Sequence, residues 1–243
     1  MTLPTIFSFL MAIIPSIFFV YYFYRQYDKP NLEPKGLIAK VFLLGIIYTF
    51  PVYIIEQGVG LINSFYNISP FIYYFFESFV VAGLCEEYIK LRIVRKYVYQ
   101  NKHFDSIMDG IIYTITASLG FACMENIIYV MNGTFITALA RGVTAVPMHA
   151  ISSGIMGYFI GKAKFSGSGE EERRLMNKGL WSAVLVHGSY DLLLFVSPIP
   201  GAIFSIIFAL FFVWSYFLLK EKINLAKSED KSILKKSQDR QSS

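Results

Sequence analysis

Charged residues are scarce in this sequence, and cysteine is scarcer still. Only 16% of the 243 residues are charged, 55% are hydrophobic, and the mean hydropathy is +0.49. A soluble protein carries about 25% charged residues, so this balance excludes an ordinary soluble domain. The two cysteines, Cys85 and Cys123, lie in apolar runs and form neither a disulfide framework nor a CxxC motif. We therefore expect an all-α polytopic membrane protein in which both cysteines are small buried side chains.

Apolar runs of spanning length occur about seven times. They cover residues 3–23, 39–55, 70–90, 107–131, 134–161, 179–196 and 199–219. No Lys or Arg precedes the first run and no small-residue cleavage site follows it, so we expect a retained helix and not a cleaved signal peptide. Pro147 interrupts the fifth run, which predicts a short helix and a bend at the proline before the span proper.

Basic residues gather in alternate connections and in the C-terminal tail. Of the 22 Lys and Arg residues, 21 fall between or at the facing ends of spans one and two, three and four, or five and six, or lie after residue 219, and Arg141 is the exception. Cytoplasmic loops collect such residues, so we expect the N-terminus outside and the C-terminus in the cytoplasm. Attraction to anionic lipid accounts for the net charge of +5, and no nucleic acid is required. We expect one transmembrane helical domain, residues 1–220, and a polar cytoplasmic tail, residues 221–243.

Ionisable side chains nevertheless occur inside the apolar runs. A charged group at the centre of a bilayer costs about 2.5–3.5 kcal/mol, so groups kept there are candidates for function. They are Glu77, Glu86, Glu87, Glu125, His149, His187 and Asp191.

The adjacent acids Glu86 and Glu87 end the third apolar run. Lys90 follows them by four and three residues, so a helix brings its ammonium within reach of both. Neighbouring helical residues point about 100° apart, so at least one acid must face the protein interior. An interfacial pair that snorkels toward the cytoplasm is the structural alternative, but Glu is too short to snorkel as well as Lys does.

The histidines lie on two later spans, each with a polar partner. His149 precedes Ser153 by four residues and His187 precedes Asp191 by four, so each pair shares one helix face. Glu125 lies deep in another span. These faces must turn away from lipid, so we expect them to line one polar intramembrane cavity. A hydrogen bond between helices is the simpler alternative for each histidine.

Several polar residues also have structural interpretations. Glu125 can hydrogen-bond its neighbour Asn126 or another helix, and Ser153 in "HAISSG" can allow helices to pack closely. Glu77 has no assigned role and can pair with Arg141.

Acids and imidazoles in a wet cavity suit peptide hydrolysis, in which a carboxylate takes a proton from water and imidazoles hold the oxyanion. A divalent metal such as zinc is an alternative cofactor but is not required, because the chain has no HExxH motif. Its ligands would be Glu86, Glu125, His149 and His187. A proton-coupled transporter that uses the same acids and histidines as a relay is a third possibility, although no inverted repeat is visible in the sequence.

Four short motifs resemble one known family. "EEYIK", "FACMEN", "HAISSG" and "HGSYD", in this order on successive spans, are similar to the PrsW family of intramembrane proteases, with a more distant likeness to the CAAX prenyl endopeptidases and bacteriocin-processing enzymes. The early "YRQYDKPNLEPKG" loop also resembles that family. The resemblance implies a bacterial plasma-membrane protease that makes the first, outward-side cut in a membrane-anchored, single-span anti-sigma factor, and so activates a sigma factor in a stress response.

The resemblance also implies roles for residues. Glu86 and Glu87 match the essential acid pair, Glu125 the following acid, and His149 and His187 the two histidines. The spacing in the sequence adds Lys90, Asn126, Ser153 and Asp191 as supporting residues. In the CAAX relatives a His stands at the place of Glu125 and an Asn at the place of Asp191, and an ionised Asp cannot donate a hydrogen bond. We expect Glu86 to be the water-activating base, with Glu87 as its competitor.

Overall fold

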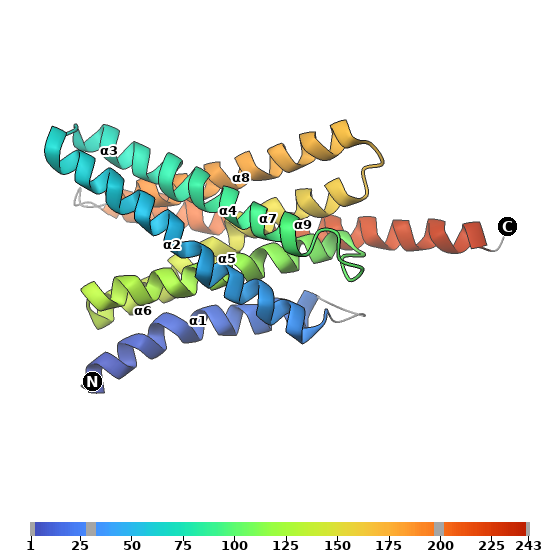
Figure 1. Cartoon of the computed structure of the whole chain (residues 1–243), viewed down its shortest axis with the longest axis horizontal. Helices are drawn as coiled ribbons and strands as arrows, with labels where there is room; N and C mark the ends of the chain where they lie inside the picture. Colours follow the sequence, from blue (N-terminus) through green and yellow to red (C-terminus); the bar gives the residue numbers. More distant parts are fainter. Residues whose placement is uncertain (1–2, 28–32, 197–201, 242–243) are drawn as a thin grey trace.

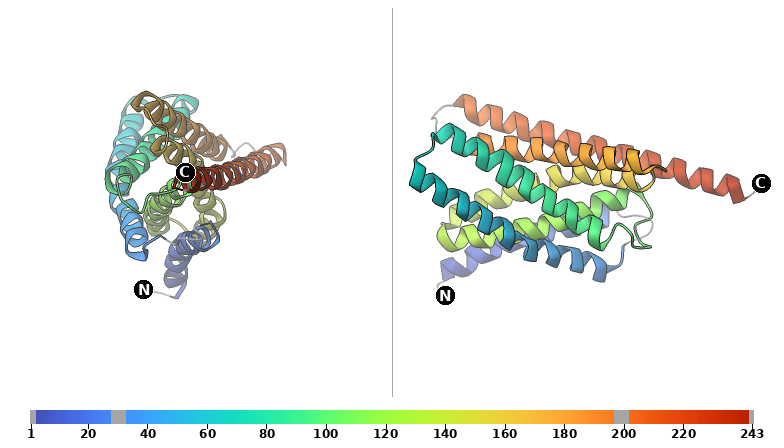
Figure 2. Two further views of the ribbon diagram at one scale, coloured as in Figure 1. Left: turned by 90° about the vertical axis from the view of Figure 1, so that its right-hand side faces the viewer. Right: turned by 45° about the horizontal axis from the view of Figure 1, so that its top comes forward.

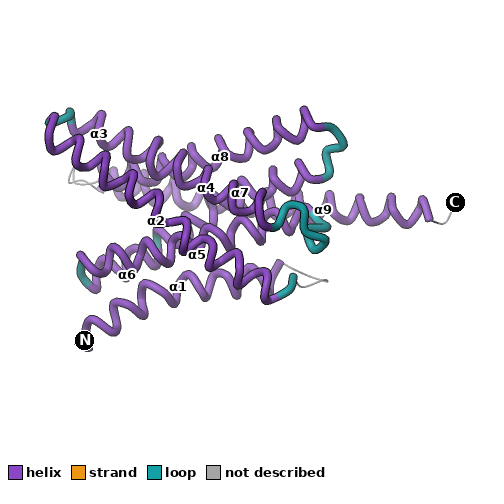
Figure 3. Tube along the Cα trace, viewed as in Figure 1, coloured by secondary structure: helices purple, strands orange, loops and turns teal. Residues whose placement is uncertain are grey.

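The computed structural model describes residues 3–27, 33–196 and 202–241, and the regular elements in these ranges are all helices (Figures 1 and 3). The elements are α1 (Leu3–Tyr27), α2 (Lys35–Tyr66), α3 (Pro70–Phe76), the π-helix η1 (Glu77–Glu86), α4 (Glu87–Tyr97), α5 (Ile107–Asn132), α6 (Phe135–Val143), α7 (Ala145–Lys164), α8 (Gly169–Val196) and α9 (Ala202–Gln241).

The long helices lie side by side in an elongated bundle, and α9 extends past its end (Figures 1 and 2). Helix α5 is central and packs against α7, α2 and α1. Within their most apolar segments 94% of the α5 residues are buried but only 11% of the α9 residues, so α9 lies at the periphery. The exposed side chains of the outer helices are large and apolar. An apolar surface of this extent is favourable in contact with lipid and unfavourable in contact with water.

Five of the described helices are long and apolar enough to cross a membrane: Phe7–Gln26, Lys35–Tyr66, Ile107–Met131, Phe135–Lys164 and Ile203–Ile233. The other two predicted spans are also helical, the third as α3, η1 and α4 in succession and the sixth as part of α8. The prediction of an all-α polytopic membrane protein is therefore confirmed.

Two predicted boundaries differ from the structure. Helix α2 continues to Tyr66, so Glu56 lies inside a helix and not beyond its end. The bend in the fifth apolar run lies at Thr144, between α6 and α7, three residues before Pro147. The predicted short helix before the span is present as α6, but the bend precedes the proline, because Pro147 occupies the first turn of α7, where a missing N–H removes no intrahelical hydrogen bond.

The N-terminus of α5 is tied to the C-terminal helix. Ser106 and Asp109 form a capping box, with each side chain accepting a backbone N–H of the other residue. Asp230 of α9 accepts the next two amides, Ile107 N at 2.7 Å and Met108 N at 3.1 Å. Helix α9 passes residue 220 without a break, and its Ile223 is buried. The division between a domain and a tail at residue 220 stays a prediction.

Candidate active site

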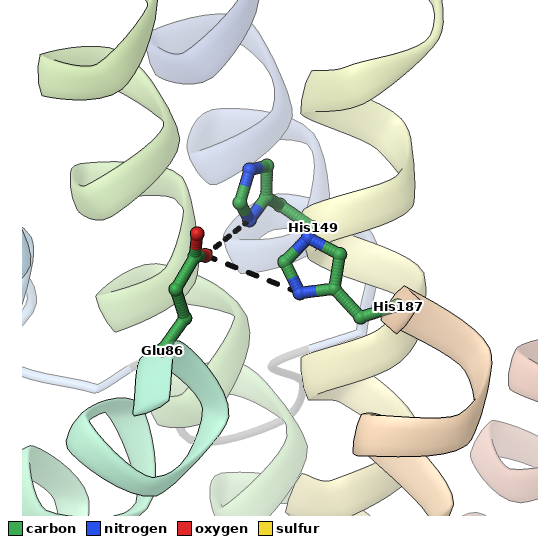
Figure 4. A group of neighbouring side chains, drawn as sticks. All are labelled: Glu86, His149 and His187. Atoms are coloured by element: carbon green, nitrogen blue, oxygen red, sulfur yellow. Dashed lines mark ion pairs between the residues drawn. The ribbon is translucent and has the colours of Figure 1, made fainter. Parts of the chain in front are cut away.

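The predicted acids and histidines of four helices lie together in the middle of the bundle. Glu86 ends η1, Glu87 begins α4, His149 comes from α7 and His187 from α8. All four are buried. In Figure 4 the Glu86 carboxylate points toward both imidazoles. Its Oε2 lies 3.9 Å from His149 Nδ1 and 4.0 Å from His187 Nδ1.

The π-helix explains how both adjacent acids face inward. Glu86 is 7% exposed and Glu87 is fully buried. The ten-residue π-helix ends at Glu86 and the α-helix begins at Glu87, so the helical register changes between them. Long π-helical segments are rare and often mark functional sites. A regular α-helix, which the sequence predicts, guarantees an interior position for only one of the pair.

Lys90 is the cation at the centre of this group. Its Nζ lies 2.7 Å from Glu87 Oε1, 3.1 Å from Glu86 Oε2 and 3.0 Å from His149 Nδ1. An ammonium has three N–H donors, and each has an acceptor here. The side chain is fully buried, and a buried charge is stable only when it is paired in this way.

Glu87 makes more contacts than Glu86. Its Oε1 also faces His187 Nδ1 at 2.9 Å, and its Oε2 accepts the Ser153 hydroxyl at 2.7 Å. Ser153 in turn lies 2.9 Å from Ser118 Oγ, so it does more than pack helices closely. Both oxygens of Glu87 are therefore engaged away from any open space.

Glu125 is held by Arg141 and not by Asn126. The guanidinium donates to Glu125 Oε1 at 2.7 Å and to Asn126 Oδ1 at 2.8 Å, and it lies 3.9 Å from the centre of the Tyr129 ring. The expected pairing of Arg141 with Glu77 is wrong, because α6 turns Arg141 toward α5. Sequence reasoning missed this role of Arg141, although Arg141 alone of the basic residues lies outside the predicted cytoplasmic segments.

The contacts of the histidines indicate their hydrogen positions. Because Lys90 donates to His149 Nδ1, the His149 proton lies on Nε2, which donates to Glu125 Oε2 at 2.9 Å. His187 faces a carboxylate on each side, Glu87 at 2.9 Å from Nδ1 and Asp191 at 3.4 Å from Nε2. Two N–H donors, as in an imidazolium, satisfy both contacts.

A cavity of about 220 Å³ reaches this group from between α2 and α5. Glu86 and Glu125 line it, together with Tyr53 and Glu56 of α2 and Tyr129 of α5. Glu56 was missed by the sequence analysis because the predicted second span ended one residue before it. A larger cavity of about 650 Å³, between α1 and α2, contains none of the acids or histidines named above. The smaller cavity is therefore the candidate active-site cavity.

Within the described residues, one group has the spacing of a metal site. Glu86, His149 and His187 each offer a ligand atom, and the three atoms lie within 4.8 Å of one another. Ligands at about 2.0–2.2 Å from a tetrahedral zinc ion lie about 3.4 Å apart, slightly closer than the 3.9 and 4.0 Å from Glu86 Oε2 to the two Nδ1 atoms. Two imidazoles and a carboxylate are a common catalytic zinc shell. Glu125, expected in this set, instead faces the outer nitrogen of His149.

Residues 33–218 match the family described as "PrsW family intramembrane metalloprotease". A relative named "Protease PrsW" from Clostridioides difficile (strain 630) is 34% identical over 225 residues, 91% of this chain and 90% of its own length. A relative with the same name from Geobacillus kaustophilus (strain HTA426) is 35% identical over 75% of this chain and 77% of its own length. Another from Bacillus subtilis (strain 168) is 34% identical over 87% of this chain and 92% of its own length. No solved structure matches the chain. The chain belongs to the PrsW family and is an intramembrane protease.

Proposed function

We propose that this protease hydrolyses its substrate with water activated by Glu86. The observation that carries this proposal is that Glu86, unlike Glu87, lines the cavity next to both imidazoles. Its Oε2 contacts Lys90, and its Oε1 has no hydrogen-bond partner among the described residues. A carboxylate oxygen that is open to a cavity can take a proton from water.

The surrounding residues hold this base in place. Glu87 anchors Lys90, Ser153 fixes Glu87, and Lys90 orients Glu86. In the proposed reaction water attacks a peptide carbonyl in the cavity and Glu86 receives its proton. Glu86 then gives this proton to the leaving amine as the C–N bond breaks.

The histidines support the same step from the other side. His187 and Lys90 place positive charge beside the oxyanion that forms, and charge fixed in advance in a buried site lowers the barrier strongly. Glu125 and Asp191 hold the two imidazoles in position, and Asn126 helps to hold Arg141 against Glu125. The family assignment favours this use of the groups over a proton-coupled transporter.

A metal-dependent form of the reaction is the second candidate. The family description and the spacing of Glu86, His149 and His187 both favour it. When bound, a zinc ion polarises a carbonyl and acidifies a water molecule. These three residues would hold it, with Asp191 at the outer nitrogen of His187 and Glu125 at the outer nitrogen of His149. Loss of activity in a chelator, restored by stoichiometric zinc, would distinguish this candidate from the first.

The substrate that we propose is a membrane-anchored protein, in particular a single-span anti-sigma factor. The family resemblance supports this substrate, and the position of the cavity among spanning helices supports a cut at the membrane. We also propose the bacterial plasma membrane as the location, with the N-terminus outside, on the basis of the basic loops.

Cleavage in liposomes tests the role of Glu86. We expect Glu86→Gln to reduce cleavage of a co-reconstituted single-span anti-sigma factor by at least about a hundredfold, because an amide cannot accept the proton from water. Glu170→Gln, which removes the same charge from an exposed position, should leave cleavage unchanged. Full cleavage by a Glu86→Gln protein that unfolds at the wild-type temperature would disprove the proposal.

A further inference from the structure

The Lys90 ammonium occupies lone pairs that a metal ion would need. Two of its three acceptors, Glu86 Oε2 and His149 Nδ1, are atoms that face each other in the Glu86, His149 and His187 group. The third acceptor is Glu87, which also contacts the Nδ1 atom of His187. The ammonium and a metal ion would therefore contact the same two atoms, Glu86 Oε2 and His149 Nδ1.

The two cations cannot be bound in this position together. A zinc ion lies about 2.0–2.2 Å from each of its ligand atoms, and Lys90 Nζ lies about 3 Å from two of the same atoms. Each lone pair can serve one cation. Two positive charges this close in a buried site would also repel each other strongly.

Lys90 is held at this position by its own helix. It lies three and four residues after the two acids, where an α-helix brings the side chains together. The side chain is fully buried, and the Phe121 ring lies 4.9 Å from the ammonium on another side. Displacement of Lys90 would therefore break two ion pairs and a contact with an aromatic ring.

We propose that Lys90 is the built-in cation of this site and competes with divalent metal ions for Glu86 and His149. In this arrangement the lysine holds the acids and the imidazole as a metal ion would, and a metal enters only when the lysine moves out. The proposal concerns the same side chains as the proposed function. It does not depend on cleavage, however, because its test measures metal binding without substrate.

Titration with Co²⁺ tests the competition, because the visible absorption of bound cobalt reports its ligands directly. We expect purified Lys90→Met in detergent to bind Co²⁺ at least about tenfold more tightly than the wild type. Lys96→Met removes the same charge from an exposed position of the same helix and should bind as the wild type does. Lys90→Met with His149→Ala should lose the gain, which would place the cobalt at this site.

A double variant shows whether tighter Co²⁺ binding comes from the lone pairs that Lys90 no longer occupies or from the change in net charge. Lys90→Met with Glu87→Gln has the same net charge as the wild type. It also removes the buried negative charge that Lys90→Met alone leaves unpaired, so it can replace the single variant in the titration if that variant does not fold. It should retain the tighter binding. Unchanged or weaker binding in the folded variants would overturn the proposal, as would one tightly held zinc ion per wild-type chain.

Discussion

Arg141 connects the acid Glu125 to a helix that contributes no other group to the site. Its guanidinium contacts Glu125, Asn126 and the Tyr129 ring at once. Glu125 in turn contacts His149. The orientation of the His149 imidazole therefore depends on a residue of α6, two contacts away.

We predict that Arg141→Gln lowers cleavage by about tenfold or more, because Glu125 loses the cation that orients it toward His149. Arg141→Lys should restore activity only partly, since an ammonium is a point donor and cannot reproduce the planar fork that reaches both Glu125 and Asn126. Initial rates of cleavage in liposomes measure both effects. Wild-type rates for folded Arg141→Gln would show that Arg141 only anchors α6.

Residues of the site differ in how far the sequence alone identifies them. Glu86, Glu87, His149 and His187 stand out because charge inside an apolar run is costly and the helical spacing pairs it. The partners Arg141 and Glu125 are 16 residues apart, on two helices joined by a turn at Gly133. Local spacing carries no information on such a contact.

At the scale of the elements, the crossing of α5 and α7 determines the distance between Glu125 and His149. A β-carbon added to Gly110 would overlap the Gly157 carbonyl oxygen, and one added to Gly161 would overlap the Ile107 carbonyl oxygen. The two backbones are therefore in direct contact. Close backbone approach through small residues is a common way to pack helices in membranes.

We predict that Gly157→Ala destabilises the protein by about 1–3 kcal/mol, because the new methyl group would clash with the Gly110 carbonyl and force the helices apart. Thermal unfolding in detergent measures the effect. Gly58→Ala is the matched control, because a β-carbon at Gly58 meets no atom within 4 Å. Equal unfolding temperatures for the two variants would contradict the tight crossing.

The elements themselves were largely predictable, because long apolar runs form helices in a membrane. The residues at which the helices begin, end or bend were less predictable. The turn at Thr144 lies between Gly142 and Pro147, which mark a break in this region but do not specify its residue. The length of α2 was underestimated because Glu56 and Gln57 interrupt its apolar run, yet both lie at the cavity where polar residues are stable.

At the scale of the whole molecule, the arrangement of the helices brings acids from the third span to histidines of the fifth and sixth. No local pattern specifies which helices are neighbours. The sequence indicates a shared cavity only through the requirement that polar faces avoid lipid. The structure shows the contacts that result, and the orientation of the bundle in the membrane is a separate property.

The charge of the connections predicts that orientation. The loop between α7 and α8 lies among Lys162, Lys164 and Arg173, whereas the loop between α2 and α3 has no basic residue. Ser168 in the first loop and Ser69 in the second are both exposed. They offer a matched pair of positions, because the same substitution can be made in each.

We predict that Ser69→Cys reacts with a membrane-impermeant maleimide in intact cells, and that Ser168→Cys reacts only after lysis. Both variants require Cys85 and Cys123 to be replaced by alanine, so that each protein carries one thiol. The basis is that basic loops stay in the cytoplasm. Gel-shift labelling before and after lysis measures accessibility, and cleavage of the substrate confirms that each variant is folded. The opposite labelling pattern would reverse the proposed orientation and would place the start of α8, with its Glu170 and Arg173, outside the cell.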